Sequence, residues 1–252
     1  MKKVLGYVAL GVCAYVAFVI ALFPADRAYA FVRSQLGDTL LYDVRGTVWH
    51  GKAAAVQVGG QTLRAVRWSV APWTVLLGRV DVDLAFDSGE SWGNGTLGLG
   101  VNKVLQVRDL ELQLPGAEVR SLLPRITVPL AGVFTVTLQE GRFNPETRQV
   151  QDLRGAVTWH NAALDMPNAP PLGTFRVDLE PGAEGIVGSL KDTGEGPLVA
   201  QGTLLLKPDN TYQFTGNFMP REAGRTEIAQ GLMFLGRPDA EGRVKVNYNG
   251  AL

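Results

Sequence analysis

The chain has 252 residues, of which 46% are hydrophobic, and its 24 basic and 24 acidic side chains balance to a net charge of zero. This length allows one large domain or two small ones, and the zero net charge argues against a nucleic-acid-binding protein, which needs a concentrated basic surface. The single cysteine, Cys13, excludes a disulfide within the chain.

Residues 4–23 carry no charge, and as a helix they would rise about 30 Å, the thickness of the hydrocarbon core of a bilayer. Lys2 and Lys3 precede this stretch and favour a cytoplasmic N-terminus. We therefore expect residues 1–23 to form a cytoplasmic tip and a single transmembrane anchor. The side chains expected to contact lipid include Val4, Leu5, Phe18, Ile20, Leu22 and Phe23.

A cleaved signal peptide is the alternative for this segment. Ala28-Tyr29-Ala30 fits a small-x-small cleavage site, with cleavage after Ala30. The uncharged stretch is longer than the usual signal-peptide core of about 7–15 residues, which favours an uncleaved anchor. Under either interpretation the rest of the chain crosses the membrane, and in a bacterial inner membrane it would lie in the periplasm.

The first half of the exported part alternates between apolar and polar residues, as half-buried strands do. Residues 24–41 look like a connector, and residues 42–252 like a β-rich body. Strands are expected at residues 43–51, 62–70, 79–86 and 109–114, with short helices at 72–77 and 118–123. Asn94-Gly95 between two apolar stretches is a hairpin signal.

The second half continues the pattern, and its best helix candidate is residues 226–235, followed by Gly236 and Pro238. Gly46-Thr47-Val48-Trp49-His50 weakly resembles residues 155–160, which suggests two similar lobes, 42–148 and 149–252. Further strands are expected at residues 132–138, 150–159, 174–179, 185–190, 198–207, 211–218 and 243–248.

The predicted fold class is mainly β, an N-terminal transmembrane helix followed by a curved antiparallel sheet with a few short helices. Strand after strand carries Leu, Val or Phe on one side only, and helices to cover those sides are scarce. Curling of the sheet into a sandwich or partial barrel would let the apolar faces meet. The alternative leaves part of that face as an open apolar groove for a lipid or a partner.

Candidate catalytic and metal-binding residues are sparse. His50 and His160 each follow a tryptophan, and two histidines without clustered cysteines or carboxylates make a poor zinc site. Residues 93–98 satisfy G-x-G-x-x-G, but the sequence continues as a strand where a dinucleotide site needs a helix. Asp81 with Asp83, and Asp109 with Glu111, alternate with apolar residues, which is typical of the solvated side of a strand. We therefore predict no enzyme, no cofactor and no metal.

Several short motifs resemble the protein N family of bacterial type II secretion systems, also called general secretion pathway protein N. They include Val44 to Gly51, Arg67 to Trp73, Leu76 to Arg79, and Gly231 to Asp239. The resemblance implies a single-pass inner-membrane protein with a periplasmic β-rich body that supports export of folded proteins across the outer membrane. The motif residues, for which a structural role is expected, are Gly46, Trp49, Trp68, Pro72, Leu76, Leu77, Gly78, Pro124, Gly236 and Gly242.

The same resemblance implies partners among other inner-membrane or periplasmic components of the secretion system, and it implies no catalytic residues. Some motifs, such as Leu76-Leu77-Gly78-Arg79, are also similar to AsmA-like envelope proteins, which are anchored β-rich chains associated with lipid traffic. This similarity keeps a lipid-binding or lipid-bridging function as the alternative.

Overall fold

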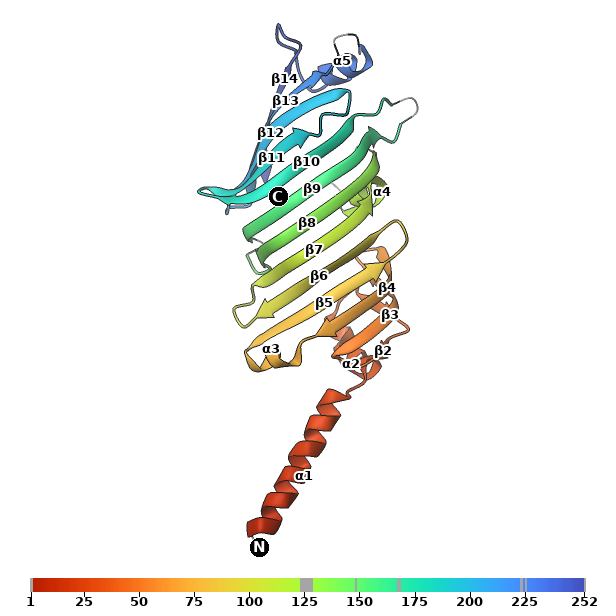
Figure 1. Cartoon of the computed structure of the whole chain (residues 1–252), viewed down its shortest axis with the longest axis vertical. Coiled ribbons are helices and arrows are strands. Elements are labelled where there is room, and N and C mark those ends of the chain that lie inside the picture. Colours follow the sequence, from red (N-terminus) through yellow and green to blue (C-terminus); the bar gives the residue numbers. More distant parts are fainter. Residues whose placement is uncertain are drawn as a thin grey trace. The chain divides into compact units, whose positions relative to one another are not determined.

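A computed structural model describes residues 2–122, 129–147, 149–166, 169–222, 224 and 226–251. The described residues form fourteen strands and a few helices, and every pairing between strands is antiparallel. The prediction of a mainly β, antiparallel protein is thus confirmed. The chain divides into two compact units, Met1–Ser88 (unit 1) and Gly89–Leu252 (unit 2). Helices and strands of both units are labelled in Figure 1.

Unit 1 contains three α-helices, a short 3-10 helix and five strands. Strand order is β1-β3-β4-β5, and β2 pairs with the outer part of β3. Strand predictions for 62–70 and 79–86 and the helix prediction for 72–77 are confirmed. The elements are α1 (Lys2–Ala21), α2 (Ala25–Val32), η1 (Arg33–Gln35), β1 (Leu40–Tyr42), β2 (Arg45–Gly46), β3 (His50–Val58), β4 (Gln61–Val70), α3 (Pro72–Leu76) and β5 (Arg79–Asp87).

The helix α1 coincides with most of the predicted anchor. Among the described residues, no helix combines the length and the apolar character needed to cross a membrane. The anchor at residues 4–23 thus stays a prediction.

Two predictions in unit 1 were wrong. Residues 43–51 do not form one strand, because the chain reverses after Gly46 and the Thr47 N–H donates to the His50 carbonyl at 2.9 Å. Asp81 does not lie on a solvated face but is only 8% exposed. The short helix α3 folds back on β5, where the Asp81 N–H donates to the hydroxyl of Thr74 on α3 at 3.3 Å, and both residues are buried.

Unit 2 is a meander in which each strand from β6 to β14 pairs with the next one in the chain. The strand predictions from residue 109 onward are confirmed, and most of these strands are longer than expected, although β12 ends one residue earlier. The elements are β6 (Trp92–Gly100), β7 (Leu105–Pro115), α4 (Gly116–Leu122), β8 (Leu130–Asn144), β9 (Gln149–Leu164), β10 (Gly173–Gly182), β11 (Gly185–Asp192), β12 (Leu198–Leu206), β13 (Thr211–Pro220), α5 (Thr226–Met233) and β14 (Val244–Ala251).

The hairpin predicted at Asn94-Gly95 was wrong, since both residues lie inside β6 where the register with β7 shifts. A Cβ on Gly95 would lie 3.0 Å from the Leu110 Cα, so glycine here permits close approach of the two strands. The glycine-rich residues 93–98 belong to the same strand, as expected.

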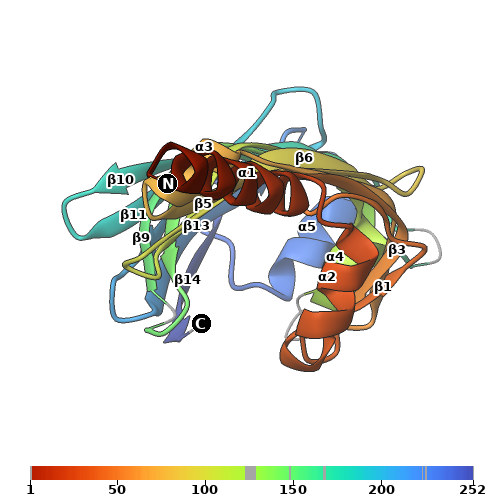
Figure 2. The same cartoon turned by 90° about the horizontal axis from the view of Figure 1, so that it is seen from below.

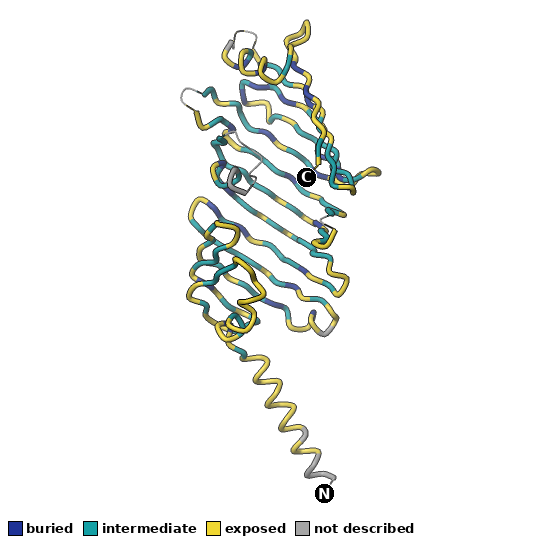
Figure 3. The backbone as a smooth tube through the Cα atoms, turned by 180° about the vertical axis from the view of Figure 1, so that it is seen from behind, coloured by how far each residue is buried: buried dark blue, intermediate teal, exposed yellow. Residues whose placement is uncertain are grey.

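The sheet of unit 2 is curved, and α5 lies on its concave side (Figure 2). There Ile228 and Leu232, one turn apart on α5, pack with the buried residues of neighbouring strands in one apolar cluster. Buried positions are spread along the strands of this unit, whereas the described side chains of α1 are exposed (Figure 3). The strand members of the cluster are Ala162, Phe175, Leu198, Ala200, Val244 and Val246.

Unit 2 thus forms one curved sheet around an apolar interior, which corresponds to the partial barrel rather than the sandwich. The predicted pair of lobes, 42–148 and 149–252, stays a prediction. Its boundary lies between β8 and β9, which pair closely along most of their length within unit 2.

Candidate functional site

The C-terminal end of α1 is bonded directly to the sheet of unit 1, and we call this connection the helix junction. In a regular helix the Ile20 carbonyl would accept from residue 24, but Pro24 has no N–H. The Ile20 carbonyl accepts from the indole N–H of Trp49 at 2.7 Å and, over a longer distance of 3.4 Å, from the Phe23 N–H. Trp49 thus supplies a donor to a carbonyl that the proline leaves without its usual helical partner.

Two further contacts complete the helix junction. The Val48 N–H donates to the Phe23 carbonyl at 3.1 Å, and Pro24 forms an isolated antiparallel bridge with Thr47. The turn between β2 and β3 is therefore used to hold the end of the helix. Gly46 starts this turn with a φ of 94°, a conformation that L side chains rarely adopt.

Trp68 supports the junction from the neighbouring strand β4, where it packs against Gly51 of β3. They lie directly opposite each other on β4 and β3, and a Cβ on Gly51 would overlap the Trp68 ring. The Trp68 indole N–H donates to the Val48 carbonyl at 3.1 Å. Gly46, Trp49 and Trp68, which were singled out by their resemblance to family motifs, are thus brought together around the turn at residues 47–50.

The motif residues Pro72, Leu76, Leu77 and Gly78 form α3 and its end. Pro72 lies at the start of the helix, and Gly78 ends it with a φ of 72° and an N–H bonded to the Val75 carbonyl at 3.0 Å. Leu77 is 79% exposed, while the side chain of Leu76 lies outside the described part of the chain. This segment follows β4, whose last residue, Val70, donates its N–H to the Trp49 carbonyl at 2.7 Å.

The remaining motif residues do not join this site. Pro124 lies outside the described residues. In unit 2 the Gly236 N–H donates to the Leu232 carbonyl at 3.3 Å where α5 ends, and Gly242 adopts a φ of 77° in the turn before β14. These two glycines shape turns beside the core of unit 2.

The proposed lipid-facing residues lie on α1 or directly after it. Phe18, Ile20 and Leu22 are 67%, 54% and 65% exposed, and Phe23 is partly buried at the helix junction. Val4 and Leu5 belong to α1, with side chains outside the described part. The described apolar side chains of this helix thus have little contact with the rest of the protein.

Away from α5, the concave face of unit 2 is apolar but less covered. Val136, Val157 and Val177 lie directly opposite one another on β8, β9 and β10, and all three are only partly buried. Leu138 is partly buried as well, whereas Leu190 packs against the apolar cluster beside α5. We call this region the open part of the inner face, with reference to the described residues only.

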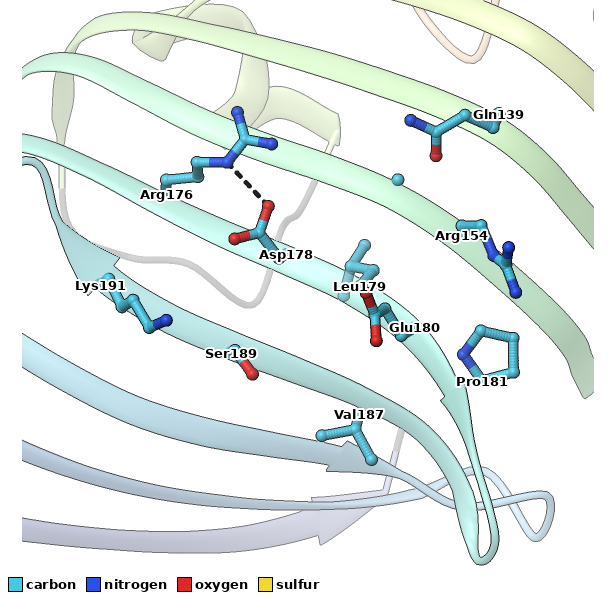
Figure 4. A pocket seen from close by; sticks show the side chains of 11 residues that line it. Gln139, Arg154, Arg176, Asp178, Leu179, Glu180, Pro181, Val187, Ser189 and Lys191 are labelled. Carbon is cyan, nitrogen blue, oxygen red and sulfur yellow. Dashed lines mark hydrogen bonds and ion pairs between the residues drawn. The ribbon is translucent and has the colours of Figure 1, made fainter.

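The polar side of the same strands has a hollow of about 580 Å³, lined in part by Arg154, Arg176, Asp178, Glu180 and Lys191 (Figure 4). Arg176 donates to Asp178 at 2.7 Å in an exposed ion pair. Ser189 supplies a hydroxyl, and no histidine is among the lining residues described there. The mixed charges fit a polar contact surface better than a reaction centre, which needs a nucleophile beside a base.

The two histidines belong to separate units, and both are exposed. Trp159, which precedes His160, stacks on Phe134 with ring centroids 5.1 Å apart and donates its indole N–H to the Ala131 carbonyl at 2.8 Å. His160 lies within β9, whereas His50 is the first residue of β3. Within the described part of the chain, no three potential ligands cluster as a metal site would require.

Two carboxyl groups in turns of unit 2 have lowered pKa values. The Thr211 hydroxyl and N–H donate to Asp209, and the N–H groups of Arg243 and Glu241 donate to Asp239. In both cases hydrogen bonds to the charged form lower the pKa. These groups stabilise turns, and neither lies at the helix junction.

Sequence reasoning missed the contact between Trp49 and Ile20. The signal was present, because Pro24 falls four residues after Ile20 and removes the donor that a helix would use. It also missed the pairing of Gly51 with Trp68, which depends on the register of β3 and β4.

Comparison with known proteins gives consistent matches. The family described as type II secretion system (T2SS), protein N, matches residues 40–247. Proteins named Type II secretion system protein N from Aeromonas hydrophila and from Vibrio cholerae serotype O1 are each 30% identical to this chain, with 100% of both chains covered. No solved structure matches the chain.

Proposed function

Because the chain belongs to the protein N family of type II secretion systems, we propose that it is a membrane-anchored, non-enzymatic component of that machinery. Residues 4–23 would hold it in the bacterial inner membrane, with residues 24–252 in the periplasm. There it would contact other inner-membrane or periplasmic components and support export of folded proteins across the outer membrane.

The helix junction is the observation that carries this proposal. Exposed apolar area costs about 25 cal/mol per Å² in water, so a helix with Phe18, Ile20 and Leu22 largely uncovered favours lipid surroundings. The bonds from Trp49 to Ile20 and from Val48 to Phe23 tie the end of that helix to the sheet. A tethered body of this kind searches a restricted volume for partners, which raises its local concentration at the membrane.

The test compares three forms of the chain in cells that lack the native protein: the full chain, a chain with an unrelated single anchor of like length, and a cleavable signal that releases residues 31–252. We expect the first two to restore export of a secreted enzyme at matched protein levels, and the released form to restore less.

A second experiment tests the topology. Alkaline phosphatase fused after Leu252 should be active, since it requires export. An inactive fusion made at normal levels would contradict the topology, and full function of the released body would contradict the tether.

A lipid-binding function is the second candidate, and the open part of the inner face favours it. Val136, Val157 and Val177 offer partly exposed apolar surface on the concave side of the sheet. Under this hypothesis phospholipid co-purifies with the full chain, and Val136→Glu lowers its amount. The matched control is Thr135→Glu, which places the same charge on the other face of β8. Equal lipid content in both variants would remove this candidate.

A further inference from the structure

Three basic residues lie directly opposite one another across three strands of unit 1. Arg45 on β2 pairs with Lys52 on β3, and Lys52 pairs with Arg67 on β4. Directly opposed residues share one face of a sheet, with Cβ atoms about 4.5–5.5 Å apart. We call Arg45, Lys52 and Arg67 the cationic row.

Like charges directly opposite each other destabilise a sheet, so this row needs an explanation. Asp43 binds Arg45 at 2.9 Å and balances one charge. Among the described residues, no hydrogen bond or ion pair reaches the side chain of Lys52 or Arg67, and both are exposed. Two neighbouring positive charges therefore remain available to an anion.

The surroundings of the row leave room for such an anion. The three basic residues line a hollow of about 360 Å³, together with Asp43, which is paired with Arg45, and with small residues such as Ala53, Ala54 and Ala65. Arginine and lysine are the side chains that bind phosphate groups, by forked hydrogen bonds and by point charge. The hollow therefore suits a phosphate group held by at least two cations.

The row also lies close to the end of α1. Arg45 is two residues before Thr47, which bridges to Pro24, the third residue after the end of α1. Two residues of strand span about 7 Å, which is within the Debye length of about 8 Å at physiological ionic strength. A membrane surface at this end of α1 would thus lie within electrostatic reach of Arg45, the first member of the cationic row.

A second feature of unit 1 fits the same environment. Trp73 and Leu77, on α3 and at its end, are 66% and 79% exposed. Tryptophan is enriched where proteins meet the membrane–water interface. The segment follows Val70, which is bonded to Trp49 of the helix junction, so it too belongs to this end of the unit.

We propose that the cationic row binds anionic phospholipid headgroups of the membrane that holds α1. This inference rests on the proposed anchoring of residues 4–23. The row would orient unit 1 on the membrane surface. The headgroup phosphate would offset the charge repulsion between Lys52 and Arg67.

The test measures how fast an amine-reactive reagent acetylates Lys52 in the full chain, reconstituted in nanodiscs. The discs contain either phosphatidylcholine alone or phosphatidylcholine with one part in three of phosphatidylglycerol. We expect anionic lipid to slow acetylation of Lys52 about fivefold, the effect of one cation at an anionic surface. Lys191 of unit 2 serves as the internal reference and should react equally in both discs.

Matched variants check that the cationic row is responsible for the protection of Lys52. Arg67→Gln should remove most of the protection of Lys52, whereas Arg64→Gln, which removes the same charge from the same strand outside the row, should leave it intact. Equal rates in both discs, or equal protection in the two variants, would overturn the proposal. So would equal protection by 10 mM inorganic phosphate with neutral discs, since the site would then take free phosphate.

Failure of the anchor can be told apart from failure of the row. Alkaline extraction releases proteins that lack a membrane-spanning segment, and release of this chain would contradict the proposed anchoring. Protection of Lys52 by anionic vesicles in such a released chain would still support the row. Retention of the chain in the membrane without protection of Lys52 would contradict headgroup binding by the cationic row but not the proposed anchor.

Discussion

Different kinds of interaction stabilise the interior of each unit. Unit 2 has a cluster of large buried side chains, including Phe175, Leu198 and Leu232. Among the described side chains of unit 1, the buried ones are only alanine, valine or polar: Ala25, Ala53, Val70, Thr74 and Asp81. In unit 1 the ring polar groups of Trp49, Trp68 and Tyr29 bond to backbone atoms instead.

This difference indicates separate roles for the units. Apolar burial stabilises by area and tolerates some repacking, whereas hydrogen bonds fix direction and contribute about 0.5–1.5 kcal/mol each. Unit 2 is therefore expected to supply most of the stability. Unit 1 is expected to fix the path of the chain from the helix into the sheet.

The largest expected effect tests the core of unit 2. Phe175→Ala removes a buried ring that lies 6.1 Å from the ring of Trp159, and such substitutions cost about 3–5 kcal/mol. Phe234→Ala is the matched control, because Phe234 is 94% exposed and the change should stay within about 0.5 kcal/mol. Denaturant unfolding of the purified full chain measures both. Similar losses would mean that the cluster is not the stabilising core.

The second prediction tests the close contact in unit 1. Gly51→Ala would force a methyl group into the Trp68 ring, and overpacking of this kind costs about 1–3 kcal/mol. Gly231→Ala in α5 meets no atom within 4 Å and should stabilise by about 0.5–1 kcal/mol. Hydrogen exchange should localise the loss to β3 and β4. An unchanged exchange rate there would show that Trp68 does not occupy the space beside Gly51.

The third prediction concerns the helix junction. Trp49→Phe keeps the ring but removes the donor to the Ile20 carbonyl, at a cost of about 1 kcal/mol. The Val48 amide, bonded to the Phe23 carbonyl, should then exchange about fivefold faster. Trp73→Phe is the control, since Trp73 is 66% exposed on α3. Equal exchange of the Val48 amide in the two variants would show that the Trp49 indole does not stabilise the helix junction.

Much of the fold could be predicted because alternation reports which side of a strand is covered. Residues 211–218 and 243–248, for example, are strands whose alternate residues Val244 and Val246 are buried. The errors arose where neighbours along the chain override this pattern. Asp81 is covered because α3 folds back over it, and Asn94-Gly95 serves close strand packing rather than a turn.

The site was less predictable than the fold. Trp49 and Trp68 were singled out, but their targets depend on which strand pairs with which and in what register. The cationic row was not recognised, because Arg45, Lys52 and Arg67 are spaced irregularly in the sequence and meet only across three strands. Such sets need the register, which alternation alone does not determine.

The smallest expected effect tests whether charge matters to unit 2. Hydrogen bonds from the Thr211 hydroxyl and N–H lower the pKa of Asp209 below its usual 3.8. A lowered pKa in the folded state stabilises above the unfolded value, and this contribution is lost as the pH falls through the folded pKa. Asp209→Asn should therefore lower the melting temperature slightly at pH 7, and the difference from the original chain should shrink below about pH 3.8.

Glu184→Gln, in the turn between β10 and β11, is the control, because within the described residues its carboxylate accepts no hydrogen bond. A difference that grows as the pH falls would reverse the sign of the assigned interaction. A shift as large as that of Phe175→Ala would contradict the division drawn between the units, since unit 2 would then depend on turn charges as much as on its apolar core.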